Sequence, residues 1–326
     1  MRRLLSFLVK AAVSAVLLYL SLRLVDLSSI EQRLSTLDWS WIAFVLLVLG
    51  SQIPLLALRW REIGLICGAS LTPATALRYS FVGTFFSQVL PSSIGGDAVR
   101  IWLLARGGAG WPTAIYSVLI DRVVGVSVLA LIVVMCLPWT VGLIHDPTAR
   151  VALALIGFGS LAAAAVFLSL SSRHLRILER WWLTRHLAAA SRLTWRLGRS
   201  AAGMRVAALS VLIHLFTVLA AWGAASAAHA SVDFTQVLFL FLPVILIATI
   251  PVSIAGWGVR EGAMVLAFSY AGLSESDGLI VSILYGAASL AIGAIGGLVW
   301  IAGGYRWRTI KTIEAETLAH LSLIHI

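Results

Sequence analysis

The chain has 326 residues, a mean hydropathy of +0.98, 60% hydrophobic residues and only 12% charged ones. A water-soluble domain has about a quarter of its residues charged, so this composition excludes a soluble globular protein and predicts an all-α integral membrane protein. The net charge of +10 comes from Lys and Arg that stand mostly between apolar runs. There they set membrane orientation, so we expect no nucleic-acid partner.

Six apolar segments are long enough to cross a bilayer, which takes about 20 residues. They cover residues 4–25, 39–58, 113–137, 150–171, 206–229 and 278–303. Two further apolar stretches, 72–90 and 235–250, each end at a break rich in Pro, Gly and Ser. A short helix is expected to follow each break, beginning near Asp97 and Gly258.

The distribution of basic residues predicts the orientation. Residues 172–205 carry eight arginines against one acid, which is typical of a cytoplasmic loop and also suits an amphipathic helix on anionic lipid. Arg59 and Arg61, both termini and this loop are predicted on the cytoplasmic side, and the acidic or neutral connections outside. The stretches 72–106 and 235–272 must then each enter and leave on one side. We therefore predict two re-entrant helical hairpins, one from each face.

The two breaks resemble each other. Residues 91–100 (PSSIGGDAVR) and 251–260 (PVSIAGWGVR) are identical at six of ten positions, and two more exchange Gly for Ala. Each motif follows two spans and precedes one, so the order span, span, hairpin, span occurs twice. Because each unit crosses three times, the second is upside down relative to the first. Inverted repeats with broken helices recur in secondary transporters.

This pattern divides the chain into a first transmembrane repeat, 1–142, a second, 143–310, and a C-terminal tail, 311–326. The last six residues of the tail, 321–326, read LSLIHI. That hexapeptide resembles the translation of a transposase adapter used in sequencing libraries. We interpret it as a sequencing artefact and exclude it from the fold.

Three motifs in this order resemble the lysylphosphatidylglycerol synthase transmembrane region family, also called flippase-like proteins. They are LPSSIGGDAVR at 90–100, LIDRVVG at 119–125 and PVSIAGWGVREG at 251–262. The resemblance implies a lipid-handling module of the bacterial inner (cytoplasmic) membrane. Two-domain members of the family add a soluble aminoacyl-transferase domain, which this sequence does not contain.

The candidate substrate-binding residues lie in and beside these motifs, because ionisable groups at membrane depth are costly and suggest function. Free N–H groups at the start of a helix also favour anions. In the first half the candidates are Ser93, Gly95, Gly96, Asp97, Arg100, Asp121 and Arg122. In the second half they are Ser253, Gly256, Trp257, Arg260 and Glu261. An equally open alternative is that the acids and arginines pair locally and only fix the hairpins.

Adjacent residues on a helix point about 100° apart, so we expect only one of Asp121 and Arg122 to reach the hairpin. His214 lies alone within a span, where an interhelical hydrogen bond is the usual role. Cys67 and Cys136 are predicted near opposite faces of the membrane, which excludes a disulfide between them.

The sequence contains no Walker A loop, HExxH, GxSxG or Cys/His cluster, so we expect no cofactor and no metal, and no catalytic constellation assigns an enzymatic activity to this chain. The leading hypothesis is translocation of an anionic phospholipid or a polyprenyl or glycolipid phosphate between leaflets. One alternative is an accessory scaffold for lipid or hopanoid modification, and another is the membrane module of a lysyltransferase-like enzyme. Membrane lipids, anionic above all, are the expected partners, with a second copy of the chain or lipid-synthesis enzymes left open.

Overall fold

The computed structural model describes residues 34–90, 95–172, 182–250 and 256–304, together with the single positions Val16, Tyr19 and Arg23. Within these residues the chain forms ten α-helices and one π-helix and contains no strand. The predicted tail 311–326 lies outside the described residues, as does the predicted span 4–25 apart from those single positions. The division into two repeats stays a prediction.

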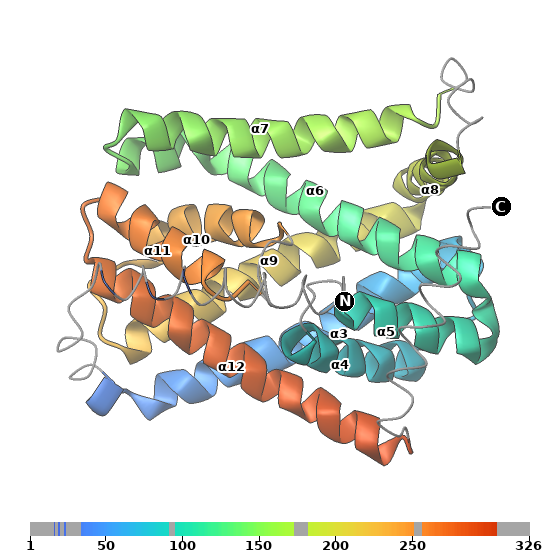
Figure 1. The fold of residues 1–326 in the computed structure, drawn as a ribbon, viewed down its shortest axis with the longest axis horizontal. Coiled ribbons are helices and arrows are strands. Elements are labelled where there is room, and N and C mark those ends of the chain that lie inside the picture. Colours follow the sequence, from blue (N-terminus) through green and yellow to red (C-terminus); the bar gives the residue numbers. More distant parts are fainter. Residues whose placement is uncertain are drawn as a thin grey trace.

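Five helices are long and apolar enough to cross a membrane. They are α3 (Trp39–Ile66), α6 (Trp111–Leu143), α7 (Pro147–Ser169), α9 (Ala201–Ala227) and α12 (Glu275–Ala302). All five run along the long axis of the molecule (Figure 1). Each coincides with a predicted span, and α3 continues to Ile66 instead of ending at residue 58.

Most helices begin at a side chain that accepts a hydrogen bond from a free N–H of the first turn. Asp233 and Gln236 form a reciprocal capping box at the start of α10 (Phe234–Ala248). The hydrogen bond from the Gln236 N–H holds the pKa of Asp233 below its ordinary value of 3.8. Further capping residues are Asp38, Thr72, Asp146, Ser200 and Ser274.

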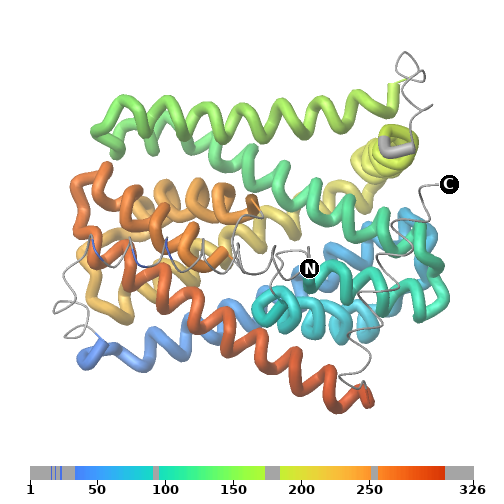
Figure 2. Tube along the Cα trace, in the orientation of Figure 1, coloured from blue at the N-terminus to red at the C-terminus, as the bar shows by residue number. Residues whose placement is uncertain are grey.

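The segment between α3 and α6 leaves one end of the bundle and returns to the same end (Figure 2). It consists of α4 (Pro73–Val89), α5 (Gly95–Leu104) and the π-helix η1 (Ala105–Ala109). Arg61 near the end of α3 donates to the carbonyl of Leu71, just before α4, at 3.1 Å. In the first turns of α6, the hydroxyl of Tyr116 lies 2.6 Å from Nδ1 of His186 in α8 (Trp182–Gly198). We call this the α8 end.

The segment between α9 and α12 behaves in the same way at the opposite end. It consists of α10 and α11 (Val259–Tyr270). Before α10 the N–H of Ser231 donates to Asp277 at the start of α12, at 3.3 Å. After α11 the carbonyl of Tyr270 accepts from the N–H of His145, between α6 and α7, at 2.8 Å. Figure 1 accordingly shows α4 and α5 in one half of the long axis and α10 and α11 in the other.

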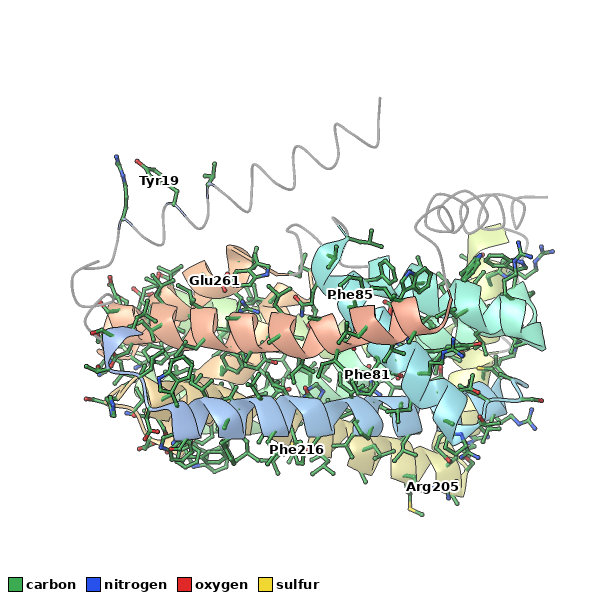
Figure 3. The ribbon with its side chains drawn as sticks, turned by 90° about the horizontal axis from the view of Figure 1, so that it is seen from below. Tyr19, Phe81, Phe85, Arg205, Phe216 and Glu261 are labelled. Atoms are coloured by element: carbon green, nitrogen blue, oxygen red, sulfur yellow. The ribbon has the colours of Figure 1, made fainter. Side chains whose placement is uncertain are left out.

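Glycines bring α12 into contact with α4. A Cβ on Gly296 would collide with the carbonyl oxygen of Phe81, and one on Gly297 would lie 3.0 Å from the ring of Phe85. Figure 3 shows both phenylalanines beside α12. Such small-residue contacts let apolar helices approach closely in lipid, where the hydrophobic effect gives no drive for association.

Helices α7 and α8 lie at the margin of the bundle. Only 11% of the most apolar stretch of α7 is buried inside the protein, against 50% for α12, and α7 follows one edge in Figure 1. Helix α8 is seen nearly end-on in the same view, so it runs across the bundle. The amphipathic helix expected within 172–205 is therefore present in its described part, while residues 173–181 lie outside the description.

Candidate functional site

The first hairpin and α6 bring two acids and two arginines together. Asp97 and Arg100 lie about one turn apart on α5, and Asp121 and Arg122 are neighbours in α6. Arg122 donates to the Asp97 carboxylate through Nε at 2.6 Å and Nη2 at 3.0 Å. Arg100 donates to Asp121 at 3.0 Å and lies 3.5 Å from Asp97. Both members of the α6 pair thus reach α5, so the expectation that only one would do so is wrong.

A third arginine, Arg59 of α3, completes the cluster. Its Nε donates to Oδ1 of Asp121 at 2.9 Å, and its side chain is 7% exposed. Its guanidinium also lies beside Gly125, where a Cβ would be only 3.1 Å away. Contrary to the prediction, Arg59 does not lie in a cytoplasmic connection, because α3 continues through it to Ile66. A buried arginine requires a charge partner, and Asp121 supplies it.

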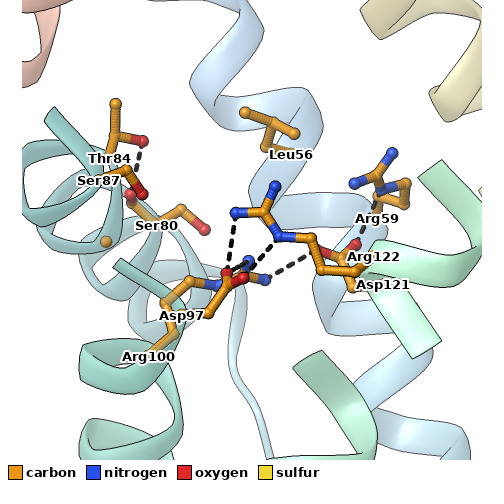
Figure 4. Close-up of a pocket in the computed structure, with 10 residues that line it drawn as sticks. Leu56, Arg59, Ser80, Thr84, Ser87, Asp97, Arg100, Asp121 and Arg122 are labelled. Carbon is orange, nitrogen blue, oxygen red and sulfur yellow. Dashed lines mark hydrogen bonds and ion pairs between the residues drawn. The ribbon is translucent and has the colours of Figure 1, made fainter. Parts of the chain in front are cut away.

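These five side chains border a cavity of about 120 Å³ between α3, α4, α5 and α6 (Figure 4). Three arginines against two aspartates leave the cluster with one net positive charge. Two buried polar atoms, Ser80 Oγ and Arg100 Nε, have no hydrogen-bond partner among the described residues. The Arg100 guanidinium is also held 4.2 Å from the centre of the Trp60 ring. A cavity with surplus positive charge and unused polar atoms is suited to an anion.

The polar wall of this cavity comes from α4. Ser80, Gly83, Thr84 and Ser87 recur at the spacing of one helix face and all line it. Gly83 also leaves room for the Arg100 side chain, because a Cβ on this glycine would lie 2.7 Å from that side chain. The predicted residues Gly95 and Gly96 are buried and do not line the cavity. Gly96 instead lets α5 approach α4, since a Cβ would collide with Ser87 and Gly83.

The second hairpin forms a closed polar cluster of a different kind. Glu261, which is 0% exposed, accepts from the Gly258 N–H at 2.6 Å and from Arg260 Nη2 at 2.6 Å. Ser282 of α12 bonds to both side chains, at 2.9 Å each. The Arg260 guanidinium lies 5.0 Å from the ring of Trp257. This group contains one acid and one arginine, so it has no surplus charge.

The structure therefore places the predicted residues in separate settings. Asp97, Arg100, Asp121 and Arg122 meet at one cavity, whereas Arg260 and Glu261 pair locally beside Trp257. Gly256 has a φ of +81°, which suits the turn before α11. Ser93 and Ser253 lie outside the described residues.

Two further predictions concern residues away from the cavity. His214 Nε2 lies 3.1 Å from the carbonyl of Gly125, which confirms the expected interhelical contact between α9 and α6. Cys67 and Cys136 are free thiols, as expected. Among the described residues no group of three or more His, Cys, Asp and Glu side chains is arranged to hold a metal ion.

Arg59 and the polar face of α4 are the parts of the cavity that the sequence analysis missed. The helical spacing of Val45, Gln52 and Trp60, all buried, continues past residue 58 and could have placed Arg59 inside α3. The recurrence of Ser, Gly and Thr at 80, 83, 84 and 87 in an otherwise apolar helix is a second signal. Both depend on helical periodicity, which an assignment of spans by hydropathy alone ignores.

Five long apolar helices and a buried charge cluster define a helical membrane protein with several spans. Within this class, the chain belongs to the lysylphosphatidylglycerol synthase transmembrane region family, whose model matches residues 7–297. Membership relates the chain to lipid modification. Comparison with curated proteins gives no match.

Proposed function

We propose that this protein moves an anionic phospholipid, or a polyprenyl or glycolipid phosphate, between the leaflets of the bacterial cytoplasmic membrane. The observation that carries the proposal is the cavity bordered by Arg59, Arg100 and Arg122. It combines one surplus positive charge with buried polar atoms that have no partner among the described residues. Guanidinium groups bind phosphate through two parallel hydrogen bonds, and the interaction strengthens where water is excluded.

The headgroup phosphate would join the cluster as a third anion and share the arginines with the aspartates. When no lipid is bound, Asp97 and Asp121 pair with the three arginines, which leaves one positive charge of the cluster uncompensated. A phosphate bound at Arg100 could use the free Nε and the hydroxyl of Ser80. The surplus positive charge of the cluster compensates a phosphate monoanion, so binding leaves neither an arginine nor an aspartate as an unpaired buried charge.

The arrangement proposed for the membrane is six spans and two re-entrant hairpins related as an inverted repeat. Helix α5 has 10 residues, so it is about 15 Å long, roughly half of a bilayer core of about 30 Å. The return of α4–α5 to the α8 end, and of α10–α11 to the other end, supports entry from opposite faces. Rocking of the two halves would expose the site to each leaflet in turn.

Cysteine labelling tests this orientation, which places the α8 end in the cytoplasm. Arg196→Cys and Thr148→Cys introduce thiols at exposed positions of the α8 end and the opposite end, respectively. We expect an impermeant maleimide to label Thr148→Cys in intact cells and Arg196→Cys only after permeabilisation. Ser191, by contrast, is fully buried and would report poorly. The reverse labelling pattern would contradict the proposed orientation.

A second candidate, a non-transporting scaffold, is favoured by the second hairpin. Arg260 and Glu261 satisfy each other with Ser282 in a buried cluster that leaves no charge for a ligand. Such a hairpin would act as a fixed support, and partner enzymes would dock elsewhere. The scaffold does not explain the surplus charge at the first hairpin, so we rank it second.

Leaflet-resolved movement of a fluorescent phospholipid distinguishes the two candidates. Proteoliposomes containing the purified protein are loaded with fluorescent phosphatidylglycerol, and the outer leaflet is quenched chemically. Translocation predicts that the protected fraction falls below that of protein-free vesicles, with a smaller effect for diacylglycerol, which has no phosphate. Equal protected fractions with and without protein would favour the scaffold.

A further inference from the structure

A second hollow meets the charged cavity at Arg122. It is a groove of about 290 Å³ between α6 and α7, and Arg122 lines both the groove and the charged cavity. The Arg122 side chain is 53% exposed, although its guanidinium is bonded twice to Asp97. Arg122 therefore connects the charged cavity to the groove between α6 and α7.

Apart from Arg122 and two serines, apolar side chains line the groove. Its walls include Val126 of α6 and Phe167 of α7. The two serines in the lining do not offer free donors, because each hydroxyl donates to its own helix. Ser127 donates to the carbonyl of Val123 and Ser160 to that of Ile156, both at 2.7 Å. An apolar chain could lie in this groove without leaving a donor unpaired.

The groove also has a closed end. Helices α6 and α7 touch where Gly157 faces Val134, since a Cβ on the glycine would lie 3.0 Å from that valine. Towards the α8 end the small side chains of Ala163 and Ala164 leave the two helices separated. The groove thus extends from Arg122 towards Gly157, along the direction of the spans.

We infer that the α6–α7 groove holds an acyl chain of a lipid whose phosphate occupies the charged cavity. Arg122 marks the junction of headgroup and chain. The ligand class is an amphiphile with a phosphate beside a long apolar tail, and it would enter sideways from the bilayer between α6 and α7. This subsite rests on the proposed function, because the headgroup position is that of the translocated lipid. The shallow burial of α7 suits such an entrance.

Photocrosslinking tests the subsite. Two probes carry the same diazirine-bearing acyl chain, one as phosphatidylglycerol and the other as diacylglycerol. The full chain is reconstituted in vesicles containing one probe, irradiated and mapped by peptide mass spectrometry. We expect phosphatidylglycerol to label residues 123–127 and 160–167 about tenfold more than diacylglycerol, because charge-assisted bonds to Arg122 hold only the phosphate. Equal labelling by both probes would show that the groove takes bilayer chains without selection and would overturn the inference.

Two matched variants separate groove filling from a general effect on α7. Ala163→Trp fills the groove, whereas Ala162→Trp adds the same side chain at the neighbouring exposed position outside it. Labelling should be lost in the first and kept in the second. Arg122→Gln should reduce the preference for phosphatidylglycerol to about one, and Arg122→Lys should retain part of it. Undiminished selective labelling in Ala163→Trp would contradict the subsite.

The same vesicles keep this inference separate from the proposed translocation. Normal lipid movement by a folded Ala163→Trp protein would overturn the chain subsite and leave translocation standing. Selective labelling of the groove in a wild-type protein that moves no lipid would support the subsite and overturn translocation. Melting curves of all variants in detergent establish that each one is folded.

Discussion

Arg100 and Arg260 occupy matching positions in the two copies of the hairpin motif, and their surroundings differ. Arg100 lies between two aspartates, and its Nε has no partner among the described residues. Arg260 is bonded to Glu261 and Ser282 through Nε and Nη2. The two similar motifs thus place their arginines in different surroundings, beside a cavity in the first and in a closed pair in the second.

This difference predicts opposite consequences of removing the two side chains. Arg260→Ala leaves the fully buried Glu261 without its cation, which should cost about 3–5 kcal/mol. Arg100→Ala leaves Asp97 with Arg122 and Asp121 with Arg59, so its cost should be clearly smaller. Thermal unfolding in detergent measures both. Equal destabilisation of the two variants would contradict the assignment of different roles.

Asp121 should be the most critical acid of the cluster. Asp121→Asn removes the charge partner of Arg59, whose side chain is 7% exposed, and we expect a loss of about 3–5 kcal/mol. The matched control is Glu62→Gln, whose partner Arg205 is 59% exposed, and which should cost about 0–1 kcal/mol. Unfolding curves of the two variants give the comparison. A mild effect of Asp121→Asn would show that Arg59 is hydrated and that the cluster is not sealed.

Close packing of α12 on α4 predicts an effect of a single methyl group. Gly296→Ala places a Cβ against the carbonyl oxygen of Phe81, and the helices must move apart. We expect destabilisation of about 1–3 kcal/mol. Gly159→Ala on α7 meets nothing within 4 Å and should be neutral or stabilising by up to about 1 kcal/mol. If both variants melt like the wild type, this contact does not hold α4 in place.

The attachment of α8 to α6 should depend on pH. Burial, together with the nearby Arg185, lowers the pKa of His186 below its ordinary value of 6.5. The folded state therefore favours neutral His186, and its contribution to stability is present above pH 6.5 and declines as the pH falls below it. Hydrogen exchange should show faster opening of α8 at about pH 5.5 than at about pH 7.5, after correction for intrinsic exchange rates. His186→Gln should remove this difference, and its persistence in that variant would assign it to another group.

Hydropathy predicted most of the long helices because it acts over whole segments. Five predicted spans coincide with long helices, and α5 and α11 begin close to the expected residues. The C-terminal end of α3 was less predictable, since Arg59 looks the same in a sequence whether it faces lipid headgroups or pairs with a distant acid. Asp121 lies 62 positions further along the chain, and only the packed helices bring the two together.

The candidate site was also predictable only in part, because its residues come from segments that only the packed helices bring together. The motifs identified Asp97, Arg100, Asp121 and Arg122, because charges within apolar segments stand out. The contrast between the two hairpins was not visible, since the motifs end in the same Val-Arg pair. It depends on what surrounds each arginine: Asp121 from α6 in one case, and Ser282 from α12 in the other.

If the cavity at the first hairpin binds the phosphate of a translocated lipid, Arg100 variants must change the rate of lipid movement. Fluorescent phosphatidylglycerol is followed in proteoliposomes that contain equal amounts of folded protein. We predict that Arg100→Ala slows movement by at least about tenfold, that Arg100→Lys retains part of it, and that Arg205→Ala at the exposed pair leaves it unchanged. Wild-type movement by a folded Arg100→Ala protein would show that the cavity does not bind the phosphate of the translocated lipid.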